Sequence, residues 1–203
     1  MSKVLHIDSS VLGEQSVSRR LADELVSKLK EKHQQVEVQR RDLVADAVPH
    51  IDGTWLTAIS TDEAARTEEQ QRKAAYSDTL IEEAENAEMI VIAAPMYNFS
   101  VPSVLKAWFD HLARAGKTFR YTDQGPEGLL KDKVAYVVTT RGGIHRDQPS
   151  DAQVPFIKSI LSLIGIDDVH FIYAEGLNMG GDAREAGLRQ AREAINDALA
   201  EER

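Results

Sequence analysis

Four serines precede an amphipathic segment near the start of this 203-residue chain, within residues 9–18. Hydroxyl donors, combined with the free backbone N–H groups at the start of a helix, suit a terminal phosphate group. The stretch contains no Lys or Arg, and it lacks both Gly-x-x-x-x-Gly-Lys-Ser/Thr and Gly-x-Gly-x-x-Gly. We therefore expect neither a P-loop nucleotide site nor a Rossmann dinucleotide site. The structural alternative is that Ser16 or Ser18 only caps the following helix.

Two aromatic residues flank an asparagine in residues 95–102, directly after a strongly apolar run. Tyr97 and Phe99 can cover a planar ring, while Asn98 and nearby backbone amides bond its polar edge. The alternative is that both aromatic rings pack against the following helix. The stretch therefore predicts either a ring-binding loop or a helix contact.

Paired glycines follow another apolar run, in residues 140–145. Gly142 and Gly143 allow positive φ and let the backbone approach a flat ligand closely. His145 can donate a hydrogen bond to a carbonyl or to an anionic ring. The alternatives are a plain turn for the glycines and a solvated side chain for the histidine. Three such stretches favour one shared site more strongly than any of them does alone.

Each of these stretches follows an apolar run short enough to be a buried strand. Strands are expected at 4–8, 36–43, 89–94, 134–140 and 169–174, and helices at 18–33, 68–87, 102–114, 152–164 and 183–202. Strict alternation of five strands and five helices predicts an α/β three-layer sandwich, in which helices cover both faces of a parallel sheet. Five strands fit the flavodoxin-like order 2-1-3-4-5, whose ligand site lies beyond the carboxyl ends of the strands.

Residues 44–66 form the least regular stretch and carry too few apolar residues for a core of their own. We therefore expect a surface excursion within a single domain of residues 1–203. A capping box formed by Thr67 and Gln70 predicts the start of the next helix.

The composition excludes several classes of function. With no cysteine there is no disulfide, no thiolate zinc site and no cysteine nucleophile, and the six histidines show no metal-ligand spacing, so we predict no metal. A net charge of −9 disfavours nucleic acid as a partner. The short apolar stretch at the start and the absence of an apolar window of about 20 residues predict no membrane segment and a soluble, cytoplasmic protein.

The motifs in these stretches resemble those of the FMN-dependent NADH-azoreductases, in the flavodoxin-like quinone reductase superfamily. The resemblance covers essentially the whole chain, and its most specific parts are Pro-Met-Tyr-Asn-Phe at 95–99 and Arg-Gly-Gly at 141–143. Further matches lie at 9–10, 16–18, 113–116, 118–121, 125–129, 140–145 and 174–176. The family usually has Gln where this chain has Val17 and Ser where it has Thr140, and a backbone amide can serve at both positions.

The resemblance implies one bound FMN per subunit. The FMN phosphate would bind Ser10, Ser16, Val17 and Ser18; the isoalloxazine would lie against Met96, Tyr97, Asn98 and Phe99; its pyrimidine side would meet Thr140, Arg141, Gly142 and Gly143. The resemblance also implies a homodimer with its active sites at the subunit interface. Phe99, Tyr121 and His145 would line the substrate, with Tyr121 on a mobile segment that either chain could contribute.

The implied activity is a ping-pong transfer, in which NADH reduces the flavin and leaves, and an azo compound or a quinone then accepts two electrons. Reductive azo cleavage would yield aromatic amines. His145 would stabilise charge on the reduced flavin or the substrate. The alternatives are an enzyme acting mainly on quinones with incidental azo activity, a flavodoxin-type electron carrier, and a domain without a cofactor. Residues 119–128 favour an enzyme, because they suit a substrate lid.

Overall fold

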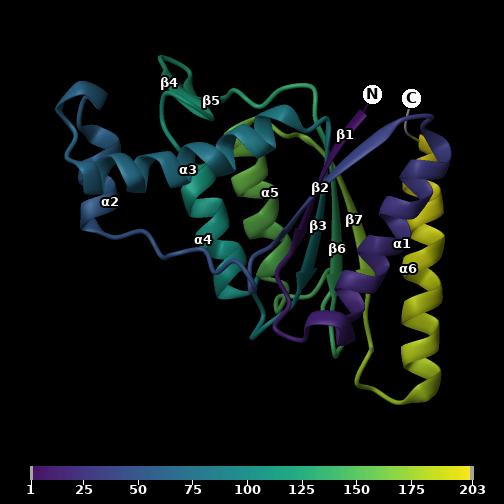
Figure 1. The fold of residues 1–203 in the computed structure, drawn as a ribbon. Helices are drawn as coiled ribbons and strands as arrows, with labels where there is room; N and C mark the ends of the chain where they lie inside the picture. The colour runs from purple at the N-terminus through teal and green to yellow at the C-terminus, as the bar shows by residue number, and fades with distance from the viewer. Residues whose placement is uncertain (1, 202–203) are drawn as a thin grey trace.

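The computed structural model describes residues 2–201, and its central feature is a five-stranded parallel sheet. The strands stand in the order β2-β1-β3-β6-β7, which is the predicted order 2-1-3-4-5 when the strands of this sheet are counted along the chain. Their bounds are Ser2–Asp8 for β1, Val36–Asp42 for β2, Met89–Pro95 for β3, Val134–Thr140 for β6 and Asp168–Ala174 for β7. In Figure 1 the carboxyl ends of these strands lie at the lower edge of the sheet.

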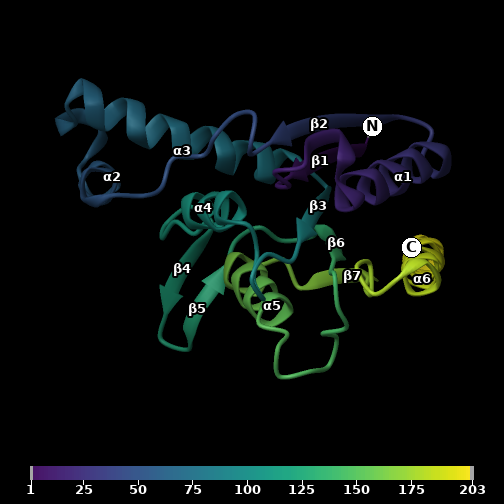
Figure 2. The same cartoon turned by 90° about the horizontal axis from the view of Figure 1, so that it is seen from below.

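Helices cover both faces of the sheet and complete the three predicted layers (Figures 1 and 2). One face carries α1 (Val17–Lys32) and α6 (Gly181–Glu201), and the other carries α3 (Glu68–Asn86), α4 (Ser103–Leu112) and α5 (Gln153–Ile164). Every residue of β3 is buried, as expected of a central strand covered on both sides. Alternate residues of β3 belong to two hydrophobic clusters, one on each face of the sheet. Val91 packs under α1 and α6, and Ile92 packs under the opposite layer.

Two helix ends follow the local signals in the sequence. The capping box at the start of α3 is present, with the Thr67 side chain accepting from Gln70 N and the Gln70 side chain accepting from Thr67 N. Helix α5 ends at Gly165, whose φ of 101° lies in the left-handed region that favours glycine.

Residues 44–66 contain regular structure that the sequence analysis did not predict. Helix α2 (Gly53–Ser60) begins after Asp52, whose side chain accepts a hydrogen bond from Trp55 N at 2.7 Å, and a 3₁₀ turn follows at Glu63–Ala65. The expectation of an irregular stretch was wrong here because Trp55 and Ala58 are buried and α2 packs on α3, so the helix needs no core of its own. Figure 1 shows α2 and the first part of α3 projecting beyond the sheet.

A two-stranded hairpin, formed by β4 (Phe119–Thr122) and β5 (Gly125–Gly128), is also additional to the five predicted strands. It packs against the carboxyl end of α5, where a Cβ on Gly128 would lie only 2.1 Å from Gly165 N. Since α5 runs opposite to the strands, this contact places the hairpin at the amino end of the sheet (Figure 1). The described residues therefore form seven strands and six α-helices rather than five of each.

Candidate functional site

The loop after β1 presents buried hydroxyl groups at the start of α1. Ser16 caps the helix, because its Oγ accepts from Arg19 N at 3.3 Å, and the same oxygen lies 2.9 Å from Ser18 Oγ. In the first turn of a helix, the N–H groups of Val17 and Ser18 have no intrahelical acceptor. Capping and phosphate binding are therefore compatible here, since neutral hydroxyl and amide donors converge at one helix end.

The first and second predicted loops are joined through Tyr97. Its hydroxyl lies 3.1 Å from Ser10 Oγ and accepts a hydrogen bond from Val11 N at 3.2 Å. Ser9 Oγ adds a second connection by donating to Ala93 O in β3 at 2.7 Å. The Tyr97 side chain thus points across the end of the sheet toward the serine loop. These hydrogen bonds explain its position, which does not require packing against the following helix.

Residues 97–100 form a tight turn in an unfavourable backbone conformation. Tyr97 and Ser100 exchange two backbone hydrogen bonds, of 2.9 and 3.1 Å, and the two residues between them have positive φ: 50° for Asn98 and 70° for Phe99. Asn adopts this region readily, whereas an aromatic residue does so at a cost. The turn leaves the Phe99 ring 56% exposed, with its edge toward His145 at a centroid distance of 5.7 Å.

The glycine loop after β6 lies beside this turn. Met96 N donates to Thr140 O at 2.9 Å, which connects the ends of β3 and β6. At Gly142 a Cβ would lie 2.6 Å from the Asn178 side chain, and at Gly143 it would lie 3.2 Å from His145 Nε2. Neither glycine has a positive φ, so what disfavours a larger residue at these positions is the closeness of the Asn178 and His145 side chains.

His145 is held by groups that the sequence analysis did not identify. Its backbone N–H donates to Glu175 Oε1 at 2.7 Å, and Arg146 N donates to the same oxygen at 2.9 Å. The His145 ring is oriented by Ser150, whose Oγ lies 2.8 Å from Nδ1. Nε2 is therefore the ring nitrogen on the side of Gly143.

Arg141, predicted to meet the cofactor, has its side chain turned inward. It is 1% exposed, makes two hydrogen bonds to the Asp151 carboxylate at 2.9 and 3.0 Å, and lies 3.2 Å from Glu175 Oε1. A buried guanidinium paired in this way fixes the loop from within. Its backbone is engaged as well, since its N–H donates to Ala174 O at 2.9 Å and its carbonyl accepts from Leu177 N at 3.1 Å.

A buried hydrogen-bond chain continues from Arg141 to the second loop. Arg141 Nε donates to Thr139 Oγ1 at 3.1 Å, and that hydroxyl donates to Gln153 Oε1 at 2.7 Å. Gln153 Nε2 then donates to the carbonyl oxygens of Ala94 and Pro95 at 3.0 and 3.2 Å. The loops after β3 and β6 are thus fixed relative to each other. The one sequence signal for Gln153 is a polar residue in the first turn of a mostly apolar helix.

Tyr121 does not lie at this site within one chain. It stands on β4 at the amino end of the sheet, with 77% of its surface exposed, whereas the three loops lie at the carboxyl end (Figure 1). The expected lid over residues 119–128 is therefore not a lid over the chain's own loops. The Tyr121 ring can therefore cover the three loops only of another copy of the chain.

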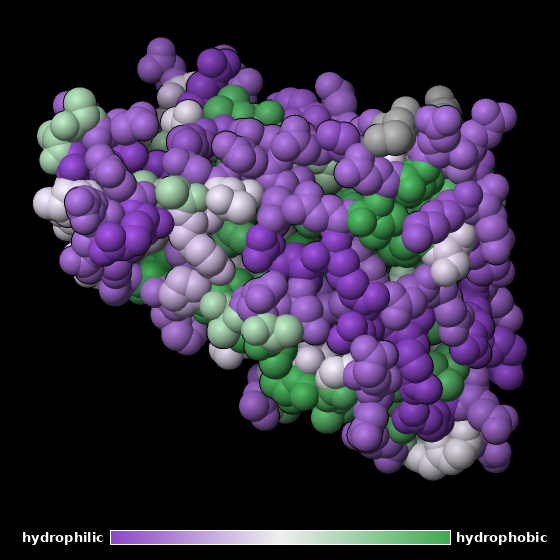
Figure 3. All heavy atoms as spheres, in the orientation of Figure 1, coloured by the Kyte–Doolittle hydropathy of each residue, from purple (hydrophilic) through white to green (hydrophobic). Residues whose placement is uncertain are grey.

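Exposed hydrophobic side chains surround the loops at the carboxyl end of the sheet. We call them the apolar rim; its members are Val11, Leu12, Phe99, Ile144 and Met179. Figure 3 shows hydrophobic side chains at several places on a mostly hydrophilic face, one of them toward its lower end. An apolar rim of this kind suits a hydrophobic ligand or a protein contact.

Within residues 2–201, no group of three or more His, Cys, Asp or Glu side chains is arranged to hold a metal ion. No helix in the same range combines the length and the apolarity that crossing a bilayer requires.

The fold is that of a flavodoxin-like protein, and its serine loop, its Tyr97 turn and its glycine loop meet at the carboxyl end of the sheet. The chain belongs to the Flavodoxin_2 family, described as having a flavodoxin-like fold, whose profile matches residues 2–199. The predicted family and fold are thereby confirmed.

Relatives with assigned names extend this result. An "FMN-dependent NADH:quinone oxidoreductase" of Saccharophagus degradans is 47% identical, covering 98% of this chain and 94% of its own. A protein of the same name from Burkholderia pseudomallei is 51% identical, with 96% and 98% coverage. A solved FMN-dependent NADH-azoreductase of Bacillus anthracis, in complex with FMN, is 26% identical with a TM-score of 0.85, covering 97% of this chain and 99% of that one.

Proposed function

We propose that the protein is an FMN-dependent oxidoreductase that uses NADH to reduce quinones and azo compounds. The observation that carries this proposal is the junction of three ligand-type loops at the switch point of a flavodoxin-like sheet. The Ser10–Tyr97 and Met96–Thr140 hydrogen bonds make that junction. Membership of the Flavodoxin_2 family and relatives named for this activity support it.

The residues present fit FMN. The Ser10, Ser16 and Ser18 hydroxyls, with the Val17 amide, would bind the phosphate without a cationic side chain. Residues 96–99 would contact the isoalloxazine, and the backbone of residues 140–143 would meet its pyrimidine side. When bound, FMN would supply hydride acceptance from NADH and two-electron delivery to the acceptor.

His145 would place a hydrogen-bond donor beside the isoalloxazine ring of FMN. The Ser150 Oγ lies 2.8 Å from Nδ1, and Nε2 faces the Gly143 side of the loop, so a proton on Nε2 would be directed toward the bound ring. We expect His145→Ala to lower the rate of hydride transfer or of quinone reduction by about a hundredfold, the low end of the range for one positioned proton donor. Single-turnover kinetics of both half-reactions measure this, and unchanged rates in both would reject the role.

A homodimer is part of the proposal. Tyr121 is exposed and lies at the far end of the sheet from its own loops, and the apolar rim remains uncovered in one chain. We infer that the Tyr121 hairpin of one subunit lies over the loops of its partner, so that each site needs two chains. Two further points stay predictions. Residues 1–203 would form a single domain, and the protein would lie in the cytoplasm, where NADH would be supplied.

Quinones are the acceptors that the comparisons favour. The relatives at 47% and 51% identity are named for quinone reduction, whereas the FMN complex named for azo reduction is 26% identical. The test is kcat/KM of the purified protein for a benzoquinone and for an azo dye at fixed NADH. A higher value for the quinone is expected. Activity with neither acceptor would overturn the proposed function.

A further inference from the structure

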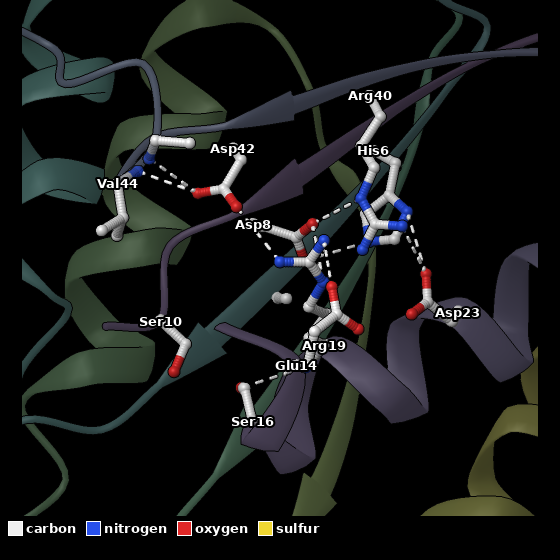
Figure 4. Close-up of polar contacts among 12 residues, drawn as sticks. His6, Asp8, Ser10, Glu14, Ser16, Arg19, Asp23, Arg40, Asp42 and Val44 are labelled. Atoms are coloured by element: carbon white, nitrogen blue, oxygen red, sulfur yellow. Dashed lines mark hydrogen bonds and ion pairs between the residues drawn. The ribbon is translucent and has the colours of Figure 1, made fainter. Parts of the chain in front are cut away.

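A cluster of charged side chains lies directly behind the serine loop, and the proposed function does not use it (Figure 4). Its centre is Asp8, the last residue of β1, whose side chain is almost fully buried. Arg40 Nε donates to Asp8 Oδ2 at 2.6 Å, and His6 Nε2 lies 3.4 Å from Asp8 Oδ1. Burial alone would raise the pKa of Asp8, but its interactions with the adjacent His6 and Arg40 side chains outweigh burial and lower that pKa below its ordinary value. Asp8 is therefore a carboxylate at neutral pH.

Arg19 connects this cluster to the loop. Its guanidinium lies 3.1 Å from Asp42 Oδ2 at the end of β2, 3.2 Å from Glu14 Oε1 in the 3₁₀ turn, and 3.7 Å from Asp8 Oδ2. Three segments that are separate in the sequence thus meet on one side chain, which is only 16% exposed. The backbone N–H of the same residue donates to Ser16 Oγ, the cap of α1.

These contacts separate two possible actions of Arg19. A free guanidinium in the first turn of a helix could attract a phosphate by its charge. Here three carboxylates surround that charge, so little of it is left for a ligand. Holding the first turn of α1 against the ends of β1 and β2 is the action that the geometry supports.

We infer that Arg19 is a positioning residue for the FMN phosphate. It holds the first turn of α1 and the 3₁₀ turn Gly13–Gln15 to the strand ends, so that the Ser16 and Ser18 hydroxyls and the helix amides stand where a phosphate would accept their hydrogen bonds. This inference rests on the proposed function. Its particular consequence is selectivity for FMN over riboflavin, which has the same ring system but no phosphate.

The test compares the two flavins on the apoprotein. In Arg19→Gln, the dissociation constant for FMN, measured by quenching of flavin fluorescence, should rise about tenfold, as for other residues that orient ligand-binding groups. The constant for riboflavin should stay within about twofold of wild type, because the ring-binding loops are untouched. Arg20→Gln is the matched control, since it removes the same charge from the same helix turn at an exposed position, and it should change neither constant.

Asp42→Asn distinguishes positioning from simple charge attraction. The amide keeps an oxygen for the Val44 and Ala45 N–H groups, which Asp42 Oδ1 accepts at 3.0 and 3.2 Å, but it cannot pair with Arg19. Positioning predicts weaker FMN binding in Asp42→Asn. Attraction by the freed guanidinium predicts tighter binding, and that result would overturn the inference.

The two proposals fail in different ways. Wild-type apoprotein that binds neither flavin would defeat the proposed function. Wild-type protein that prefers FMN, with the same preference kept in Arg19→Gln and Asp42→Asn, would defeat the role of Arg19 alone. If Arg19→Gln does not fold, as judged by circular dichroism, the sign of the change in Asp42→Asn decides.

Discussion

At the scale of single residues, the site depends on side chains that perform a structural task and a binding task together. Ser16 caps α1 and also stands beside Ser18 at the helix start. Glu175 accepts from two successive backbone N–H groups, at residues 145 and 146, and lies against the buried Arg141. Such double use means that a variant at one of these positions changes stability and binding at once, and the two effects must be measured separately.

The double variant Ser16→Ala/Ser18→Ala tests the phosphate end. Losing the cap should cost about 1 kcal/mol of unfolding free energy. Losing two hydroxyl donors should weaken FMN binding by about tenfold to a hundredfold, at about 1 kcal/mol or more for each hydrogen bond. Urea unfolding and flavin titration of the apoprotein measure the two effects. Ser27→Ala, at an exposed position on the same helix, is the control and should leave FMN affinity unchanged.

Sequence patterns identify residues of the site when the signal is local. The serines before α1, the Tyr-Asn-Phe turn and the glycine pair all stand next to the strand that positions them, so their place follows from the strand order. Glu175, Gln153 and Arg19 were missed because their roles depend on partners elsewhere in the chain. Glu175, for example, holds a residue 30 positions away, and no periodicity in the sequence records such a contact.

At the scale of elements, the turn at residues 97–100 stores strain at the site. The backbone of Phe99 has a φ of 70°, which glycine adopts freely and phenylalanine does not. We expect Phe99→Gly to raise the unfolding free energy of the apoprotein by about 0.5–1 kcal/mol, because Asn-Gly is the preferred sequence for a turn with two positive φ angles.

The same change should weaken substrate binding, because the exposed ring beside His145 is lost. Phe99→Ala is the matched variant: it removes the ring equally but gains no backbone freedom, so its stability should not rise. Equal stability of the glycine and alanine variants would show that the turn is unstrained. KM for the quinone should increase in both.

Helix α2 is attached to the body through a buried histidine. His111 Nε2 lies 2.9 Å from Pro49 O, and the ring packs edge-on against Trp55 and Tyr76. Burial lowers the pKa of His111 below its usual value of 6.5, against the opposing effect of the Pro49 hydrogen bond. The unfolded chain therefore binds this proton more readily than the native protein does.

The consequence is a loss of stability as pH falls. Above pH 6.5 the His111 ring is unprotonated in both the native and the unfolded protein, so it adds no pH dependence. Below pH 6.5 the unfolded chain takes up the proton first, and the free energy of unfolding declines. Urea midpoints between pH 7.5 and pH 5 should fall more steeply in wild type than in His111→Gln. Parallel curves for the two proteins would contradict this account.

The elements themselves were largely predictable. The central strands and their flanking helices follow from apolar runs and amphipathic spacing, strict alternation favours a parallel sheet covered on both faces, and the number of strands fits the order 2-1-3-4-5. Helix α2 and the β4–β5 hairpin were not predicted, because each is short and gains its stability by packing on elements distant in the sequence. The Gly-Pro-Glu-Gly sequence of β5 has low strand propensity and pairs only because β4 lies opposite it.

At the scale of the whole molecule, the two ends of the sheet have different roles. The carboxyl end carries the loops, and the amino end carries the hairpin with the exposed Tyr121. We expect Tyr121→Ala to lower kcat/KM for the quinone more than it lowers FMN affinity, because in the proposed dimer the ring covers the partner's substrate side while the partner's own loops hold the flavin. A change in FMN affinity matching the change in kcat/KM would count against this arrangement.

A mixed dimer identifies which chain supplies Tyr121. One subunit carries Tyr121→Ala, and the other carries Ser16→Ala/Ser18→Ala, so that only the first retains tight FMN binding. If the hairpin covers the partner's site, the FMN bound to the first subunit lies under the intact Tyr121 of the second subunit. That one site of the mixed dimer then works normally. If it acts within its own chain, the mixed dimer is as impaired as the Tyr121→Ala dimer.

The central claim, that three loops at the end of a flavodoxin-like sheet bind FMN for transfer from NADH to a quinone, is tested most directly by anaerobic mixing. Apoprotein loaded with FMN is mixed with NADH and then with a quinone, while the visible absorption band of the flavin is followed. The account predicts that the band disappears with NADH and returns with the quinone. A protein that binds FMN but keeps the band unchanged in excess NADH would contradict it.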